Sequence, residues 1–140
     1  MKILVAIDQS DYAINVMEAA LKQAATAPGA KLTVMTVNNV PFANAYMADV
    51  PTSLIAAIRN TASQGLERAA AQAKNQGVGV STVMEESLSP AESIVNFAKK
   101  NAYDLIVLGH RGRGAIEGFL IGSVAARVVQ HAPCSVLVVR

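Results

Sequence analysis

Cysteine, charge and long apolar runs are all scarce in this sequence of 140 residues. Its one cysteine, Cys134, cannot form an internal disulfide, which fits a reducing compartment. Charged residues make up only 16% of the chain, and the formal net charge is +2 without a basic stripe. So small a charge argues against a nucleic-acid partner.

The apolar run at the N-terminus, Ile3–Ile7, ends at Asp8 and is too short for a signal peptide or a membrane span. We therefore expect a cytoplasmic protein that does not contact a membrane. Hydrophobic residues nevertheless form 52% of the chain, so a globular core is available. The length suits one domain over residues 1–140.

Short apolar runs rich in β-branched residues alternate with stretches of helical period. Strands are predicted at 2–7, 32–37, 78–84, 104–108 and 135–139, with a helix in each of the four intervals. Strands without polar alternation are typical of a sheet that is covered on both faces. The order predicts an α/β fold, namely an open five-stranded parallel sheet of Rossmann-like type with helices on both faces.

Helix starts and inward faces can be proposed from residue types. Ser10, Ser89 and Ser123 each stand where a capping hydroxyl would begin a helix. Ile14 belongs to an apolar series at helical spacing in the first helix, and Val129 to one in the last. We expect both side chains to face the sheet.

A glycine-rich stretch, 109–123, follows the fourth predicted strand and leads into the last helix. Five of the nine glycines of the chain lie in it, at 109, 112, 114, 118 and 122, together with Arg111 and Arg113. Free backbone N–H groups, arginines and a helix N-terminus can together hold an anion, most simply a phosphate. The alternative is a flexible connection without a ligand.

Asp8 follows the first strand, and Gly109 ends the fourth. If those strands are neighbours, the carboxylate faces the glycine-rich stretch across the crevice in which open parallel sheets bind ligands. Such a carboxylate could hold Mg²⁺ beside bound phosphates, or could simply be a turn residue. A dinucleotide fingerprint is excluded because no glycine follows the first strand, and a P-loop because no lysine precedes Ser123.

The remaining spacing is Gly109, two residues, Gly112, nine residues, then Gly122-Ser123. This spacing resembles the nucleotide-binding signature of the universal stress protein family, in its ATP-binding branch. The segments 3–10, 104–109 and 132–139 also resemble the first, fourth and last strands of the family, and the resemblance covers the whole chain. A serine, Ser135, stands where the family usually has proline.

The resemblance implies a strand order of 3-2-1-4-5 and a site for ATP with Mg²⁺ or Mn²⁺. Asp8, the expected metal ligand, would line the adenosine side with Ala6 and Ile7, and Val37 would contact adenine through its backbone. The residues that would hold ribose and phosphates are Gly109, Gly112, Gly122, Ser123 and the amide of Val124. Arg111 or Arg113 could reach the phosphates or lie in solvent, and we include Arg111 in the predicted site.

Three functions remain open. The first is an ATP-binding stress-response regulator whose nucleotide-bound dimer is recognised by partner proteins. The second is a slow ATP hydrolase, for which His110 is the one candidate base, and the third is a chaperone-like dimer that acts without nucleotide. Members of the family commonly dimerise, and we expect a homodimer through the apolar last strand, Ser135–Val139, which no further strand would cover. The segment 38–51 is either a cover over the sheet or a ligand-covering loop.

Overall fold

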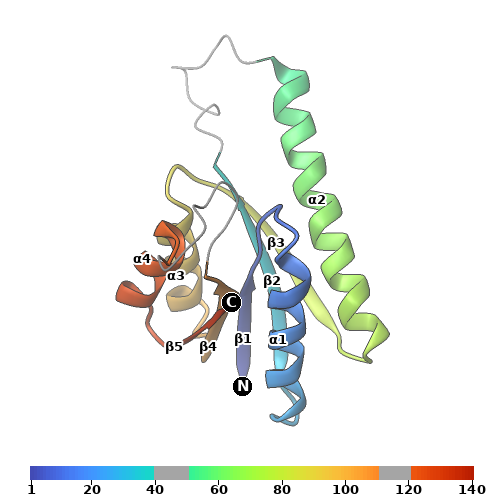
Figure 1. Cartoon of the computed structure of the whole chain (residues 1–140), viewed down its shortest axis with the longest axis vertical. Coiled ribbons are helices and arrows are strands. Elements are labelled where there is room, and N and C mark those ends of the chain that lie inside the picture. The colour runs from blue at the N-terminus through green and yellow to red at the C-terminus, as the bar shows by residue number, and fades with distance from the viewer. Residues whose placement is uncertain (40–50, 111–120) are drawn as a thin grey trace.

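The computed structural model of the chain describes residues 1–39, 51–110 and 121–140. Five parallel strands form one sheet in the order β3-β2-β1-β4-β5 (Figure 1). The elements are β1 (Lys2–Ala6), α1 (Ala13–Ala25), β2 (Lys31–Asn38), α2 (Thr52–Asn75), β3 (Val80–Glu86), α3 (Pro90–Lys100), β4 (Leu105–Gly109), α4 (Ser123–His131) and β5 (Ser135–Val139). The predicted fold class and strand order are confirmed.

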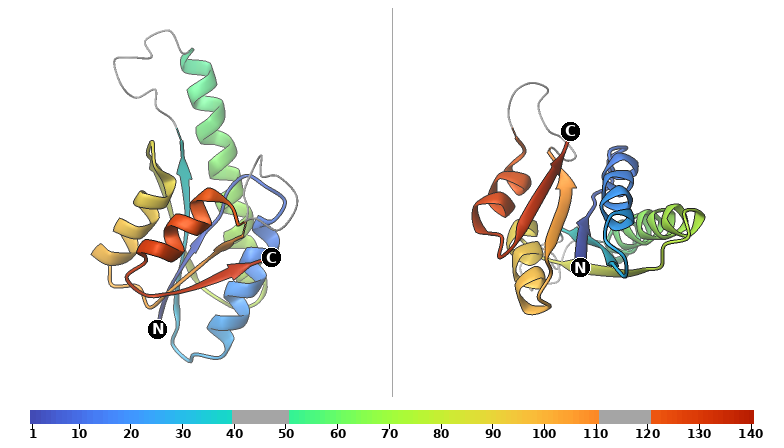
Figure 2. Two further views of the ribbon diagram at one scale, coloured as in Figure 1. Left: turned by 60° about the vertical axis from the view of Figure 1, so that its left-hand side comes forward. Right: turned by 90° about the horizontal axis from the view of Figure 1, so that it is seen from below.

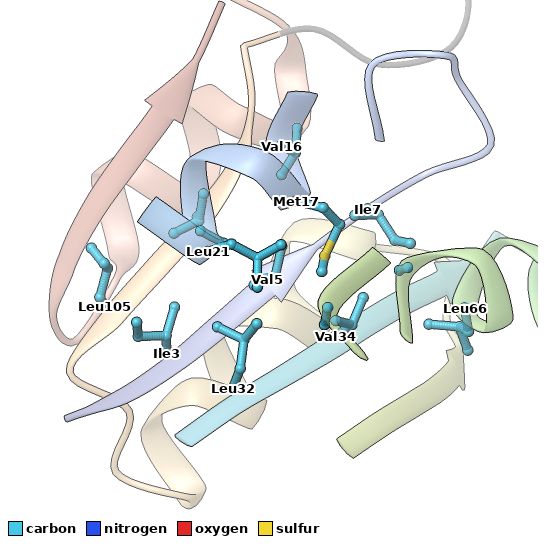
Figure 3. Packing of buried hydrophobic residues seen from close by; sticks show 14 residues of the cluster. Ile3, Val5, Ile7, Val16, Met17, Leu21, Leu32, Val34, Leu66 and Leu105 are labelled. Carbon is cyan, nitrogen blue, oxygen red and sulfur yellow. The ribbon is translucent and has the colours of Figure 1, made fainter. Parts of the chain in front are cut away.

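Helices cover the sheet on both faces, with α1 and α2 on one face and α3 and α4 on the other (Figure 2). The alternation of side chains along β1 explains this arrangement. Ile3 and Val5 point into the cluster under α1 and α2, which Figure 3 shows, whereas Leu4 points into the cluster under α3 and α4. All three side chains are fully buried, so β1 is the centre of both cores. Burial of each contributes about 1.5–3 kcal/mol.

The register of the sheet brings two chain segments together at the carboxyl ends of the strands. Ala6 of β1 pairs with Leu108 of β4, so the residues that follow these two strands emerge side by side. The backbone beyond β1 is also tied to β2, because the Ile7 amide donates to the Met35 carbonyl at 3.0 Å. Asp8 therefore begins its turn from a fixed position.

Two predicted helix starts were wrong. α1 has Tyr12 at its N-cap and no capping side chain, and the Ser10 hydroxyl donates to Asp8 Oδ1. α4 has Gly122 at its N-cap, so that Ser123 is the first helical residue. The cap of α3 is confirmed, since the Ser89 hydroxyl accepts a bond from the Glu92 amide at 3.4 Å.

Two side chains expected to face the sheet lie outside. Ile14 is 64% exposed and Val129 is 49% exposed. In α1 the buried face is made by Val16, Met17, Ala20 and Leu21, which leaves Ile14 off that face. Within the described ranges, no helix combines the length and the hydropathy that a membrane crossing requires.

Candidate functional site

A cavity of about 680 Å³ opens at the carboxyl ends of the strands, between the two helical layers. We call it the strand-end cavity. Eight of the ten residues in the predicted nucleotide site line it: Ala6, Ile7, Asp8, Val37, Gly109, Gly122, Ser123 and Val124. The other two, Arg111 and Gly112, lie outside the residues that the structure describes. The loop segment 40–50 lies outside them as well.

The turn after β1 brings Asp8 to the wall of the strand-end cavity. Its Oδ1 accepts a hydrogen bond from the Ser10 amide at 2.9 Å and another from Ser10 Oγ at 2.5 Å. Aspartate commonly bonds to the backbone two residues further along in this way, which fixes the turn. The expectation that Asp8 is a turn residue and the expectation that it faces a ligand are thus both compatible with its position.

The N-terminus of α4 forms another part of the wall. The Gly122 amide donates to the His110 carbonyl at 2.6 Å, which brings the start of α4 back to the end of β4. The next three amides, of Ser123, Val124 and Ala125, have no acceptor among the described residues, and no side chain caps the helix. These N–H groups and the positive end of the helix dipole form an arrangement that suits an anion.

Beyond these two parts of the wall, the cavity is largely apolar. Met35 and Val37 of β2, Ile58 of α2, and Pro90 and Ile94 of α3 line it. A flat, weakly polar ring can lie against such side chains, while a charged group attached to it reaches the α4 amides. The site can therefore hold a ligand with an apolar ring at one end and an anion at the other.

Asp8 is the one charged side chain among the described residues that line the cavity. The described residues contain no group of three or more His, Cys, Asp or Glu side chains that could hold a metal ion. Mg²⁺ seldom has an all-protein cage, since it is usually bound by one or two carboxylates and by phosphate oxygens.

Polar side chains around the cavity include several that sequence reasoning missed. Gln9, Thr36, Asn38 and Asn39 all line it. The Thr36 hydroxyl donates to the Ile7 carbonyl at 3.0 Å, which fixes the residue just before Asp8. The signal that could have identified them is topological, because each lies at or next to the carboxyl end of a strand.

The groups with shifted pKa values lie outside the strand-end cavity. Hydrogen bonds from the Arg59 guanidinium, at 2.9 and 2.7 Å, lower the pKa of Glu86 at the end of β3. Burial raises the pKa of the Cys134 thiol, as expected of a cysteine that packs rather than reacts. Neither group is a candidate for chemistry on a ligand in the cavity.

Comparison with known proteins gives one consistent result. A model described as the universal stress protein family matches residues 1–140. A universal stress protein from Methanocaldococcus jannaschii is 34% identical, over 99% of this chain and 81% of that protein. The structure of universal stress protein UspA from Lactobacillus plantarum is 29% identical, with a TM-score of 0.87 over 100% of this chain and 97% of that chain. A universal stress protein solved in complex with cAMP is 25% identical, with a TM-score of 0.76 over 100% and 97%.

Proposed function

The chain belongs to the universal stress protein family, and from that premise we propose that it binds an adenine nucleotide, ATP with Mg²⁺, in the strand-end cavity. The observation that carries this proposal is the convergence of four chain segments on one cavity. The turn at Asp8, the end of β2 at Val37, the end of β4 at Gly109 and the start of α4 all line it. Only the tertiary structure brings them together.

In this proposal the phosphates lie at the N-terminus of α4, where the amides of Ser123 and Val124 donate to them. The base lies between Val37 and the apolar side chains of α2 and α3. The ribose lies near Asp8, whose carboxylate can accept hydrogen bonds from hydroxyl groups. The related protein that was solved with cAMP supports the choice of an adenine nucleotide.

Mg²⁺ would be bound by phosphate oxygens, with Asp8 as the protein ligand. The donor set fits a magnesium ion of this kind, because a single carboxylate is enough when phosphates supply further oxygens. When bound, the ion neutralises phosphate charge and orients the phosphate chain. Manganese would occupy the same position with the same oxygen ligands.

We further propose that the protein holds its nucleotide and turns it over slowly, if at all. Hydrolysis requires a group that orients or deprotonates the attacking water. Asp8 is the one charged lining side chain in the described part of the cavity, and its Oδ1 already accepts two hydrogen bonds from Ser10. This supports a regulatory role, in which partner proteins recognise the nucleotide-bound state.

The recognised form would be a homodimer. β5 lies at the edge of the sheet beyond β4, and its residues Val136–Val139 are only partly buried. Pairing of β5 with the same strand of a second chain would cover this apolar edge.

The proposal is tested by calorimetric titration of purified protein with ATP and Mg²⁺, together with mass spectrometry of any nucleotide that co-purifies. We expect one ATP per chain, and weaker binding when Mg²⁺ is chelated. Absence of both co-purified nucleotide and measurable ATP binding would reject the proposal. It would leave the nucleotide-independent, chaperone-like dimer as the remaining function.

A further inference from the structure

The first turns of α2 bury little of their surface against the rest of the molecule. The buried residues of this helix all lie at or beyond position 62, namely Ala62, Leu66, Ala69 and Ala73. None of the residues 52–61 is buried, and Leu54 is 50% exposed. Figure 1 shows this end of the helix extending beyond the sheet. A segment with so little buried apolar surface opens at a lower free energy than the core does.

This end of α2 nevertheless supplies part of the wall of the strand-end cavity. Ile58 lines the cavity and is half-buried, and α2 contributes no other residue to the described lining. The position of Ile58 is therefore only as well fixed as the first turns of the helix. A ligand that packs against this side chain is retained better when those turns are held in place.

Arg59, the next residue, connects the first turns of α2 to the end of β3. Its Nε and Nη2 atoms donate to the two carboxylate oxygens of Glu86, at 2.9 and 2.7 Å. The two side chains are 51% and 26% exposed. Most ion pairs with such exposure contribute little, but a guanidinium that bonds to both carboxylate oxygens has the geometry that does contribute. The Thr61 hydroxyl, by contrast, donates to the Ala57 carbonyl of the same helix.

Glu86, the acceptor, is itself fixed beside the cavity wall. It is the last residue of β3 and pairs with Asn38 in the register of the sheet. The next residue, Ser87, donates its amide to the Asn38 carbonyl at 3.0 Å. Asn38 lines the strand-end cavity and is 6% exposed. The ion pair thus joins a weakly attached segment to a part of the sheet that also borders the cavity.

We propose that the Arg59–Glu86 ion pair holds the first turns of α2, and with them Ile58, against the strand-end cavity, and thereby slows the release of a bound nucleotide. This inference rests on the proposed function, since it assumes that a nucleotide binds in this cavity. Arg59 and Glu86 are positioning residues, because neither lines the cavity and both act on the ligand through Ile58. Loss of an interaction of this kind is expressed mainly in the dissociation rate.

Amide hydrogen exchange tests the effect of the ion pair in the absence of nucleotide. Arg59→Ala should raise the exchange rates of residues 52–61 about threefold, whereas residues 62–75 should keep their wild-type protection. Glu86→Ala should have the same effect. The double variant should exchange no faster than either single variant, because the first substitution already removes the ion pair.

Surface plasmon resonance with Mg²⁺-ATP tests the effect on release. The dissociation rate should rise about threefold in Arg59→Ala, in Glu86→Ala and in the double variant. At about 1 M sodium chloride the difference from wild type should shrink, because salt screens exposed charges. Loss of packing by the arginine stem would not depend on salt. Arg59→Lys should restore part of the retention, since lysine keeps the charge but not the two-pronged geometry.

Arg68→Ala is the matched control. Arg68 is an exposed arginine of the same helix that lies beyond Ala62. Its substitution should leave both the hydrogen exchange of residues 52–61 and the dissociation rate of ATP at their wild-type values. Thermal unfolding verifies that each variant is folded.

Wild-type dissociation rates in Arg59→Ala and Glu86→Ala would overturn the inference and leave the proposed function intact. Unchanged hydrogen exchange of residues 52–61, or faster dissociation that high salt does not diminish, would overturn it as well. If wild type binds no ATP, the proposed function itself fails, and the inference about release fails with it.

Discussion

Thr36 connects the core of the sheet to the turn that carries Asp8. The substitution Thr36→Val tests how much that connection contributes to the free energy of unfolding. The side chain is 2% exposed, and its hydroxyl donates to the Ile7 carbonyl at 3.0 Å. Among the described residues, no backbone amide bonds to that carbonyl. Valine keeps the shape of the side chain but leaves the carbonyl without its donor. Loss of a partner by a buried polar group costs about 1–3 kcal/mol.

The free energy of unfolding, measured by urea titration, should therefore fall by about 1–3 kcal/mol in Thr36→Val. The melting temperature should fall by roughly 3 °C or more for each kcal/mol in a chain of this size. Thr82→Val is the matched control, because Thr82 is exposed on β3 and should change stability by less than about 0.5 kcal/mol. ATP affinity should also fall in Thr36→Val, since Ile7 directly precedes Asp8. A Thr36→Val protein as stable as the Thr82→Val control would refute the reasoning.

Three further predictions concern the dimer, the pH dependence and turnover. Light scattering should give twice the chain mass of 14.6 kDa, and Val138→Pro should give a folded monomer; a wild-type monomer at micromolar concentration would reject the β5 interface. Because Arg59 lowers the pKa of Glu86 below the ordinary 4.5, this pair stabilises the protein above that pH and loses its effect as the pH falls through the lowered pKa. The difference in urea midpoint between wild type and Arg59→Ala should thus shrink from pH 7 to pH 3, and a constant difference would contradict the assignment. Phosphate release from Mg²⁺-ATP should be well below roughly 1 per second; a rate of several per second that is lost in His110→Ala with binding retained would favour an ATPase.

The architecture could be predicted because the patterns that indicate strands and helices are local in the sequence, and because the family resemblance supplied the rest. The run Ile3–Ile7 has no polar alternation, which indicates a strand buried on both faces, and Ile3, Leu4 and Val5 are indeed fully buried. The strand order required more than pattern, since periodicity does not say which strands are neighbours. The family resemblance supplied the strand order, and the pairing of Ala6 with Leu108 confirms that β1 and β4 are neighbours.

Side-chain environments were harder to predict, because they depend on where each helix lies over the sheet. Leu54 belongs to an apolar series in the sequence, yet it is 50% exposed because the first turns of α2 extend beyond the sheet (Figure 1). Ser123 has the chemistry of a cap, but the bond from the Gly122 amide to His110 places the helix start one residue earlier. The sequence did not indicate that Gln9 lies near Gly65 of α2, because only the folded chain brings these two segments together.

The central claim is that nucleotide binds at the walls formed by Asp8 and the start of α4, and Gly122→Val tests it most directly. Gly122 has φ −63° and ψ 157°, an extended conformation that valine also adopts, so the fold should persist. The valine side chain would occupy the space in which phosphates approach the α4 amides. Calorimetric titration with Mg²⁺-ATP should show binding to wild type and to the control Gly79→Val, and none to Gly122→Val. Equal ATP affinity in wild type and folded Gly122→Val would contradict the account.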